Sequence, residues 1–360
     1  MRNIKKNNKK KMNIKEAPVK RFWILCITLS SLFIFAFFAS FVSGRYSGVS
    51  IDSVFKILVN QVIEVFEQTW EARDVTVVIK LRLPRILGAI LVGAALAVSG
   101  ATYQALFANP MASSDTLGVS SGAGLGACFG ILLGWGSSLI STSAFIIGVI
   151  AVLITLFVSM LISRGKNATV FLVLIGMVIS SFLSAIISII KYIADPEEQL
   201  PEITYWLMGS FSGVDMKEVL IFLVLFLLGF IPLFLIRWRM NLFSLSYYEA
   251  RSLGANVNAL RVVCIICATL LTAASVAISG GIGWVGLVIP HIVRIIVGND
   301  FRHILPASAL MGSVYLLIMD NISRCMFASE VPIGILTSVI GVPVFFIILI
   351  LYRRNLVDGT

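Results

Sequence analysis

Long hydrophobic stretches, separated by short polar segments, follow one another along nearly the whole chain. A stretch of about 20 mostly apolar residues crosses a bilayer as an α-helix. The patterning is helical and does not alternate residue by residue, which argues against a membrane β-barrel. We therefore predict an all-α polytopic membrane protein with ten transmembrane helices. The predicted spans are residues 22–42, 83–107, 116–135, 141–163, 168–193, 216–237, 258–279, 282–298, 305–327 and 332–352.

The segment 43–82 between the first two spans has a different pattern. Apolar residues recur at helical spacing with charged residues between them, at Ile51, Val54, Phe55, Leu58, Val62, Ile63 and Phe66. This pattern predicts an external amphipathic surface helix. The run Val75–Ile79 favours extended chain leading into the second span.

Composition supports a single membrane domain over residues 22–354. The chain is 58% hydrophobic and 13% charged, whereas soluble domains keep about a quarter of their residues charged. Residues 1–21 carry nine Lys or Arg and predict a disordered basic cytoplasmic tail, able to contact anionic membrane lipid. The apolar span that follows at once argues against a nucleic-acid arm. Residues 355–360 form a short second tail.

The distribution of charge predicts the orientation. Ten spans place both termini on one side, and with the N-terminus inside, the inner segments carry 19 of the 28 Lys and Arg residues. Lys and Arg are enriched in cytoplasmic loops. We therefore expect a multi-pass protein of the cytoplasmic membrane with cytoplasmic termini.

The chain offers no constellation for catalysis. It has no phosphate-binding P-loop, and its two histidines, His291 and His303, form no cluster with other candidate groups. The pair Cys264-x-x-Cys267 has redox or metal spacing, but buried cysteines more often pack as small hydrophobes. We predict a protein that is not an enzyme and that holds no cofactor or metal.

The longest inner loop, 238–260, predicts two short helices. Ser244 or Ser246 is positioned to cap the second helix, and Gly254 to end it. Such a folded loop indicates a docking surface for a soluble partner, or else an ordinary interfacial segment.

Few ionisable residues lie in the spans. Asp320 and Arg324 are four residues apart and share a helix face near its predicted outer end. Together with Arg82 and Arg85, they predict either a local ion pair or outward-facing docking charges.

Long ordered stretches resemble one family, the FecCD-type permease subunits of type II ABC importers. Together they span nearly the whole chain from about residue 75 to 354 and read RLPRILGAILVGAALAVSGATYQALFANPMASSDTLGVSSGAGLG, YWLMGSFSGVD, ARSLGANVNALR, AISGGIGWVGLVIPHIVR and EVPIGILTSVIGVPVF. The N-terminal tail and much of 43–74 carry no signature of the family.

The resemblance implies partners. It implies a ten-helix permease paired with a second copy or a close paralogue, two separate ATP-binding cassette ATPase subunits inside, and an extracytoplasmic substrate-binding protein outside. ATP hydrolysis would then take place on the ATPase subunits.

The resemblance also implies roles for particular residues. Arg82, Arg85 and Arg324 match positions that dock the binding protein, and a bidentate guanidinium suits carboxylate partners. The ATPase-coupling positions correspond to Glu249, Ala250, Arg251, Leu253 and Gly254. Helix-packing, turn and signature positions correspond to Ser99, Gly100, Asn109, Pro110, Gly118, Gly286, Pro290 and His291. We expect Asn109-Pro110 to form the inner turn between the second and third helices, and Pro290 to kink its helix.

The predicted function is import of an iron chelate (a siderophore) across the cytoplasmic membrane. Import of haem or of cobalamin by the same architecture stays open, as does the choice between homodimer and heterodimer. A stand-alone secondary transporter is the alternative from another class. It would need intramembrane carboxylates for ion coupling, and the spans hold almost none besides Asp320.

Overall fold

The computed structural model describes the backbone of residues 2–44, 50–61, 63, 65–162, 168–326 and 329–357, and within these ranges every regular element is helical. The α-helices are α1 (Arg2–Val42), α2 (Ile51–Asn60), α3 (Ala72–Val75), α4 (Leu83–Leu106), α5 (Val119–Leu132), α6 (Ser137–Ile162), α7 (Ala168–Ile193), α8 (Gln199–Met208), α9 (Met216–Ile236), α10 (Tyr247–Ser252), α11 (Val257–Ser279), α12 (Val285–Val297), α13 (Phe301–Cys325) and α14 (Ile333–Val357). Three further short helical segments are the π-helix η1 (Thr76–Arg82) and the 3-10 helices η2 (Ser114–Leu117) and η3 (Arg239–Ser244).

Seven helices in the described part of the chain are long and apolar enough to cross a membrane. Three shorter apolar helices, Val119–Leu132, Val285–Val297 and Ile333–Ile348, lie where the sequence predicts the spans 116–135, 282–298 and 332–352. A helix of 14 residues is only about 21 Å long, less than the ~30 Å hydrocarbon core. Seven of the ten predicted spans therefore correspond to long apolar helices, α5 and α12 are shorter than predicted, and α14 continues beyond the apolar stretch Ile333–Ile348 to Val357.

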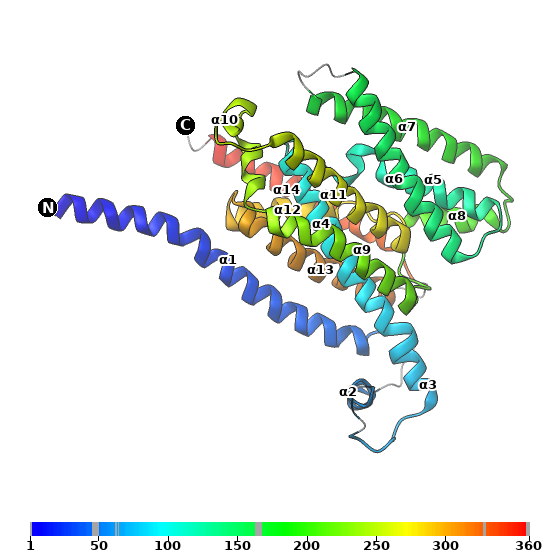
Figure 1. Cartoon of the computed structure of the whole chain (residues 1–360). Helices are drawn as coiled ribbons and strands as arrows, with labels where there is room; N and C mark the ends of the chain where they lie inside the picture. The colour runs from blue at the N-terminus through cyan, green and yellow to red at the C-terminus, as the bar shows by residue number, and fades with distance from the viewer. Residues whose placement is uncertain are drawn as a thin grey trace.

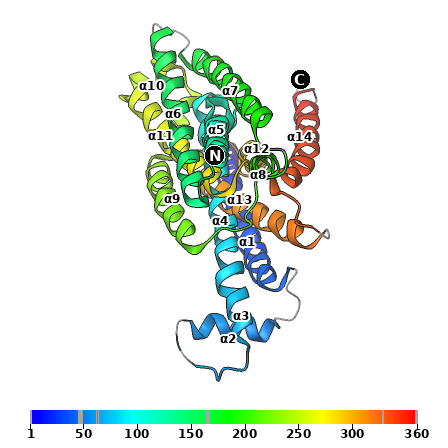
Figure 2. The ribbon, with the colours of Figure 1, turned by 90° about the vertical axis from the view of Figure 1, so that its right-hand side faces the viewer.

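The helices run roughly side by side between two ends of a bundle (Figure 1). The start of α1, the end of α14 and α10 lie toward one end, which we call the α10 end. Helices α2 and α3 project beyond the opposite end, the α3 end, as Figure 2 also shows.

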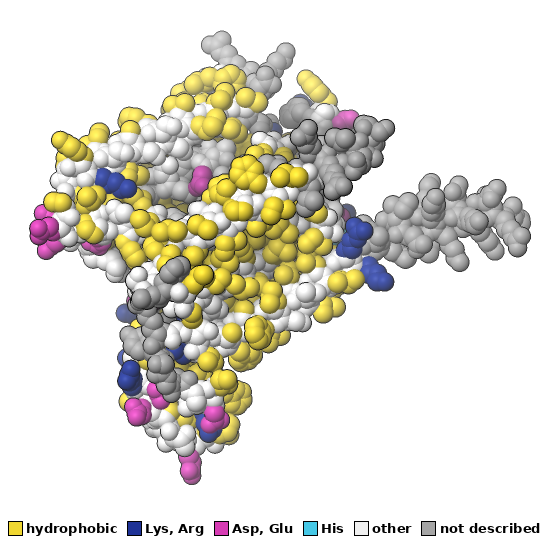
Figure 3. Space-filling view, turned by 180° about the vertical axis from the view of Figure 1, so that it is seen from behind, with side chains coloured by type: hydrophobic (Ala, Val, Ile, Leu, Met, Phe, Trp, Pro, Cys, Tyr) yellow, Lys and Arg dark blue, Asp and Glu magenta, His cyan; other side chains and the backbone are white. Residues whose placement is uncertain are grey.

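Helices α4, α11 and α13 form the interior of the bundle. In an apolar stretch of 18 residues within the helix Ala72–Leu106, which includes α4, 83% of the residues are buried. In the corresponding stretch of α7 only 17% of the residues are buried. Figure 3 shows a broad hydrophobic surface with charged side chains gathered mainly toward its margins, as expected for helices whose outer faces meet lipid.

Two glycine contacts bring α4 close to its neighbours. A Cβ added at Gly93 would overlap the Gly312 carbonyl of α13, and one added at Gly100 would overlap the Gly286 carbonyl of α12. Pro290 has no N–H to donate to the carbonyl of Gly286, four residues earlier. The freed carbonyl lies against Gly100. Pro290, Gly286 and Gly100 together therefore allow α4 and α12 to pack closely.

The segment before α4 corrects a prediction. Val75–Ile79 is helical and not extended, because α3, η1 and α4 follow one another without a break from Ala72 to Leu106. A capping box starts this helix, in which the Asp74 carboxylate accepts the N–H of Glu71 at 3.3 Å. The β-branched run suggested a strand, but a continuous helix satisfies its backbone groups internally beside the membrane.

The predicted surface helix is present as α2, and it is shorter than the apolar pattern that runs from Ile51 to Phe66. It begins at Ser50, whose hydroxyl accepts the N–H of Ser53 at 3.1 Å. It ends at Asn60, whose side chain binds the backbone N–H and carbonyl of Phe66 at 3.0 and 2.7 Å. Ile63 and Phe66 therefore lie beyond the helix, and Val62 lies outside the described residues.

The first helix is longer than predicted, because α1 extends back to Arg2 where the sequence predicts a disordered tail over 1–21. Lys and Glu are good helix formers, so this segment continues the helix that the apolar span begins.

The connection from α4 to α5 agrees with the predicted turn. The side chain of Asn109 accepts the N–H of Met111 at 2.9 Å and closes the turn around Pro110. Gly118 adopts a left-handed backbone with φ of 84° between η2 and α5. Ser99 is buried in α4 and donates to the Leu96 carbonyl at 3.0 Å.

Candidate functional site

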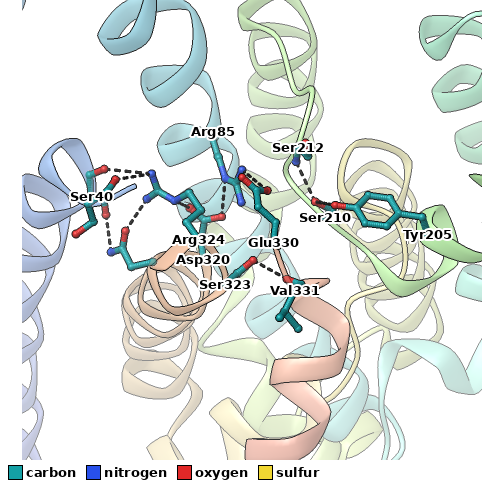
Figure 4. A network of polar contacts seen from close by, with 12 residues as sticks. Ser40, Arg85, Tyr205, Ser210, Ser212, Asp320, Ser323, Arg324, Glu330 and Val331 are labelled. Atoms are coloured by element: carbon teal, nitrogen blue, oxygen red, sulfur yellow. Dashed lines mark hydrogen bonds and ion pairs between the residues drawn. The ribbon is translucent and has the colours of Figure 1, made fainter. Parts of the chain in front are cut away.

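A buried cluster of charges lies near the α3 end, where α4 meets the end of α13 (Figure 4). We call it the arginine cluster and define it as Arg82, Arg85, Asp320, Arg324 and Glu330. Asp320 lies between two guanidinium groups, with one oxygen 2.8 Å from Nε of Arg85 and the other 3.0 Å from Nε of Arg324. Nη1 of Arg85 also pairs with Glu330 at 2.9 Å. The Asp320–Arg324 ion pair is one of the two alternatives that the sequence offered, whereas Arg85 reaches Asp320 across 235 positions of chain.

The C-terminal end of α1 caps this cluster. Arg82 donates to the Phe41 carbonyl. Arg324 donates to the carbonyls of Ser40 and Ser43 at 3.3 and 3.2 Å, and Asn321 donates to the Ser40 hydroxyl at 2.7 Å. The cluster thus connects three helices that are far apart in sequence. No local pattern in the sequence marked Glu330 as a member of the cluster or Ser40 as its hydrogen-bond partner.

The arginines that the resemblance assigns to docking are buried in this chain. Arg82, Arg85 and Arg324 are 4, 7 and 6% exposed, and Asp320 is fully buried. Buried charges require partners because desolvation is costly. Three arginines face two carboxylates, so the cluster carries one excess positive charge. Nη2 of Arg85 is buried without a hydrogen-bond partner among the described residues.

The α10 end carries the second candidate site, the loop predicted to dock a soluble partner. It forms η3 and α10, as the sequence predicts for 238–260. Ser246, and not Ser244, caps α10 by accepting the N–H of Glu249, while Glu249 accepts the N–H of Ser246 at 2.9 Å. Hydrogen bonds from the backbone and the side chain of Ser246 lower the pKa of the Glu249 carboxyl. Gly254 follows the helix with φ of 75°.

The loop presents apolar groups beyond the helical bundle. Tyr248 is 81% and Leu253 is 69% exposed, while Ala250 is buried. A cavity of about 470 Å³ opens beside them and is lined by Arg251, Gly254, Ala255, Asn256, Val257 and Asn258. Exposed apolar side chains at a polar, folded loop are typical of a protein interface.

The same loop is tied to α13. Asn241 of η3 donates to the Asp300 carboxylate at 2.9 Å and accepts the N–H of Phe301 at 3.0 Å. Because Asp300 caps α13, this contact fastens the loop to the start of the helix whose other end carries Asp320 and Arg324.

The predicted signature residues lie in α12 between the two ends. Gly286 and Pro290 make the glycine contact described above, and the His291 ring lies 6.3 Å from the Phe345 ring. Arg294 donates to the Gln104 side chain at 3.3 Å, and Gln104 donates to the Leu287 carbonyl at 3.1 Å. These contacts hold α12 against α4 and α14 and indicate a structural role.

The predicted cysteine pair lies inside the bundle. Cys264 and Cys267 are buried free thiols of α11, in the same apolar cluster as Leu271. Among the residues that the structure describes, no three His, Cys, Asp or Glu side chains gather as a metal-ion site.

Comparison with known proteins gives consistent matches. Residues 32–351 match the sequence profile of the FecCD transport family. The molybdate import system permease of Haemophilus influenzae is 40% identical, covering 78% of this chain and 82% of its own length. A permease named for an iron chelatin transport system in Helicobacter pylori is 41% identical, covering 78% and 83%. The vitamin B12 import system permease of Citrobacter koseri is 38% identical, covering 79% and 86%.

A solved structure described as an inward-facing conformation of a metal-chelate type ABC transporter superposes with a TM-score of 0.79. It is 38% identical and covers 91% of this chain and 98% of its own.

Neutralising the carboxylate at the centre of the arginine cluster should destabilise the bundle. Asp320→Asn removes the charge that Arg85 and Arg324 share, and breaking such a buried pair costs about 3–5 kcal/mol. We expect a clear fall in the midpoint of thermal unfolding in detergent. The control is Glu330→Gln, which should cost far less because Glu330 is 25% exposed and binds only Arg85. Equal losses in the two variants would contradict this account of the cluster.

Proposed function

The chain belongs to the FecCD transport family of ABC importer permeases and is a multi-pass protein of the cytoplasmic membrane, and from this premise we propose that it imports an iron chelate. In this proposal, two separate ATPase subunits drive transport and an extracytoplasmic binding protein delivers the substrate. The observation that carries it is the agreement between a metal-chelate structure at TM-score 0.79 and an iron chelatin relative at 41% identity.

Relatives named for vitamin B12 and molybdate, at 38 and 40% identity, make those substrates the competing candidates. All three are bulky or charged cargoes that a separate binding protein can select. The ligand bound by the binding protein that docks on this permease distinguishes them, because only a chelate-binding partner agrees with iron import.

The arginine cluster argues against a stand-alone, ion-coupled transporter. Such a protein needs an intramembrane carboxylate that can release and take up an ion or a proton. Both oxygens of Asp320 lie within ion-pair distance of guanidinium groups, at 2.8 and 3.0 Å, which favours a structural role for this carboxylate.

The α10 end is the cytoplasmic end in our proposal. Arg237, Arg239 and Arg251 lie there, in line with the enrichment of Lys and Arg in cytoplasmic loops. The α3 end then faces the outside, and the arginine cluster lies where a binding protein would dock.

Docking on this cluster requires an exchange of partners. The guanidinium groups are buried and already paired, and Glu330 is the partly exposed carboxylate that occupies Arg85. We propose that an acidic side chain of the binding protein competes with Glu330 for Arg85 and is attracted by the excess positive charge of Arg82, Arg85 and Arg324. Bidentate pairing with carboxylates is the strength of arginine over lysine.

Coupling to the ATPase subunits falls to Glu249, Ala250, Arg251, Leu253 and Gly254 in this proposal. Tyr248 and Leu253 supply exposed apolar contact area, and the adjoining cavity at Arg251 can receive a side chain of the partner. Charge at the rim and apolar groups at the centre are what a protein interface needs.

Helix α13 offers a mechanical connection between the two docking surfaces. Its start is held to the coupling loop by Asn241 and Asp300, and its end carries Asp320 and Arg324. A helix of 25 residues is about 37 Å long. We propose that displacement of the loop by the ATPase subunits shifts α13 and thereby the arginine cluster.

A second permease subunit is expected against the face formed by α8, α12 and α14. A cavity of about 400 Å³ there is lined by Leu207, Met208, Gly281, Gly283, Gly334, Ile335, Ser338 and Val339. Non-helical backbone crosses this region, with Ser210 N–H bonded to the Ser279 carbonyl at 2.8 Å and Ile333 N–H to the Gly209 carbonyl at 2.9 Å. Such backbone is tolerated within a membrane where it is buried in protein or lines a watery cavity, which supports a permeation path at this face.

Reversing charge in the arginine cluster should abolish docking. For the double variant Arg82→Glu with Arg324→Glu we expect loss of binding-protein capture and of uptake, with co-purification of the ATPase subunits retained. Because both arginines are buried and Arg324 pairs with Asp320, thermal unfolding of the variant is measured alongside to show that it is folded. The control is Arg302→Glu, an exposed charge at the start of α13, at the opposite end. Pull-down and uptake are measured together, and unchanged uptake in the double variant would refute the docking assignment.

Deleting residues 248–256 should uncouple the permease from its ATPase subunits, because the deletion removes the exposed side chains of the loop. Leu253→Asp tests the same contact with less disturbance and should weaken co-purification of the ATPase. Leu133→Asp is the matched control, since Leu133 is 59% exposed after α5. If the ATPase still co-purifies with the deletion variant, the loop is not the coupling surface.

A further inference from the structure

A small cavity near the α10 end lies between the ends of four membrane helices. It measures about 210 Å³ and is walled mainly by apolar side chains of α4, α6, α7 and α11. Its lining residues are Leu106, Phe107, Leu156, Ser159, Met160, Leu172, Asn258, Arg261, Val262 and Ile265. The cavity shares Asn258 with the cavity beside the proposed coupling loop, and its other lining residues lie outside the proposed docking surfaces and permeation face.

One cation belongs to the lining. Arg261 lies in the first turns of α11, and its Nε is buried without a hydrogen-bond partner among the described residues. The lining contains no carboxylate. Arg261 is partly buried, so its guanidinium reaches the polar margin while its Nε offers a donor that an anion in the cavity can accept.

The cavity lies at the surface that lipid would cover. Met160 and Val262 at its edge are 69 and 47% exposed, whereas Leu106, Leu172 and Ile265 in its walls are buried. An occupant can therefore enter sideways from the membrane. It meets an apolar pocket first and the guanidinium at the polar margin.

We propose that this cavity binds one anionic phospholipid. Its phosphate pairs with Arg261, and a segment of one acyl chain fills the space between Leu106, Leu156 and Ile265. Arginine binds phosphate through parallel N–H donors, and basic pockets between membrane helices on the cytoplasmic side suit anionic headgroups. The cytoplasmic leaflet follows from the proposed orientation, while the site itself does not depend on it.

The apolar walls favour a lipid over a free phosphate ion. An inorganic ion would gain the charge pair alone and would leave the cavity unfilled. A phospholipid adds the packing of its acyl chain against the apolar walls of the cavity. The cavity lies between the beginning of α11 and the ends of α4 and α6, directly after the proposed coupling loop in sequence. A lipid bound there would contact all three helices.

Lipid binding to the purified, detergent-solubilised permease tests the proposal. Native mass spectrometry with added phosphatidylglycerol or phosphatidylcholine should show preferential retention of phosphatidylglycerol by the unaltered protein. Arg261→Gln should weaken phosphatidylglycerol binding by about tenfold, the effect of losing one charge-assisted contact, and should leave phosphatidylcholine binding unchanged. Arg302→Gln, which removes an exposed charge outside the cavity, should behave as the unaltered protein does.

A second variant separates the acyl pocket from the charge. Ser159→Leu fills the cavity and keeps Arg261, and it too should lose phosphatidylglycerol. Thermal unfolding of each variant shows whether it is folded. Undiminished phosphatidylglycerol binding by folded Arg261→Gln would overturn the proposal, and so would complete displacement of the lipid by inorganic phosphate at equal concentration.

Discussion

The carboxylate of Asp320, fully buried between Arg85 and Arg324, is the interaction on which the arrangement of the bundle near the α3 end depends. A charge in this environment is tolerated only when it is paired, since removing it from water costs several kcal/mol. The pairing joins α4 to α13, and the arginines in turn bind carbonyl groups at the end of α1. Farther along the same helix pair, Gly93 and Gly312 bring the two backbones into contact. Charge pairing and close packing therefore act together on α4 and α13, which form the centre of the protein.

This arrangement gives α13 contacts at both proposed working surfaces. Asp300 at its start accepts a hydrogen bond from the loop that we assign to the ATPase subunits, and Arg324 near its end belongs to the cluster that we assign to the binding protein. A continuous helix can carry a displacement from one surface to the other, which is the role that we propose for α13. The packing of Gly100 on Gly286 holds α12 against α4. Helix α12 therefore lies beside α4, which packs in turn against α13.

Much of this structure could be predicted from the sequence, because it depends on local patterns. Hydrophobic length located the membrane helices, and capping chemistry placed the start of α10 at Ser244 or Ser246, of which the structure uses Ser246. The hydrophobic pattern did not predict the structure correctly where a segment is not a regular membrane-spanning helix. The β-branched residues Val75–Ile79 suggested a strand, yet they continue a helix that starts at Ala72. The helices at 119–132 and 285–297 are shorter than predicted because glycine-rich connections occupy part of their span. Contacts across hundreds of residues, such as Arg85 with Asp320 and Glu330, left no local signal, and neither did the position of Arg261 at a cavity.

The central claim is that this permease imports its substrate only as part of an ATP-driven assembly. The most direct test is uptake into proteoliposomes that contain the permease with its ATPase subunits, ATP inside and the binding protein loaded with a radiolabelled iron chelate outside. The account predicts uptake that requires ATP, the ATPase subunits and the binding protein together. Accumulation of the chelate by the permease alone, driven by a proton or sodium gradient, would contradict it.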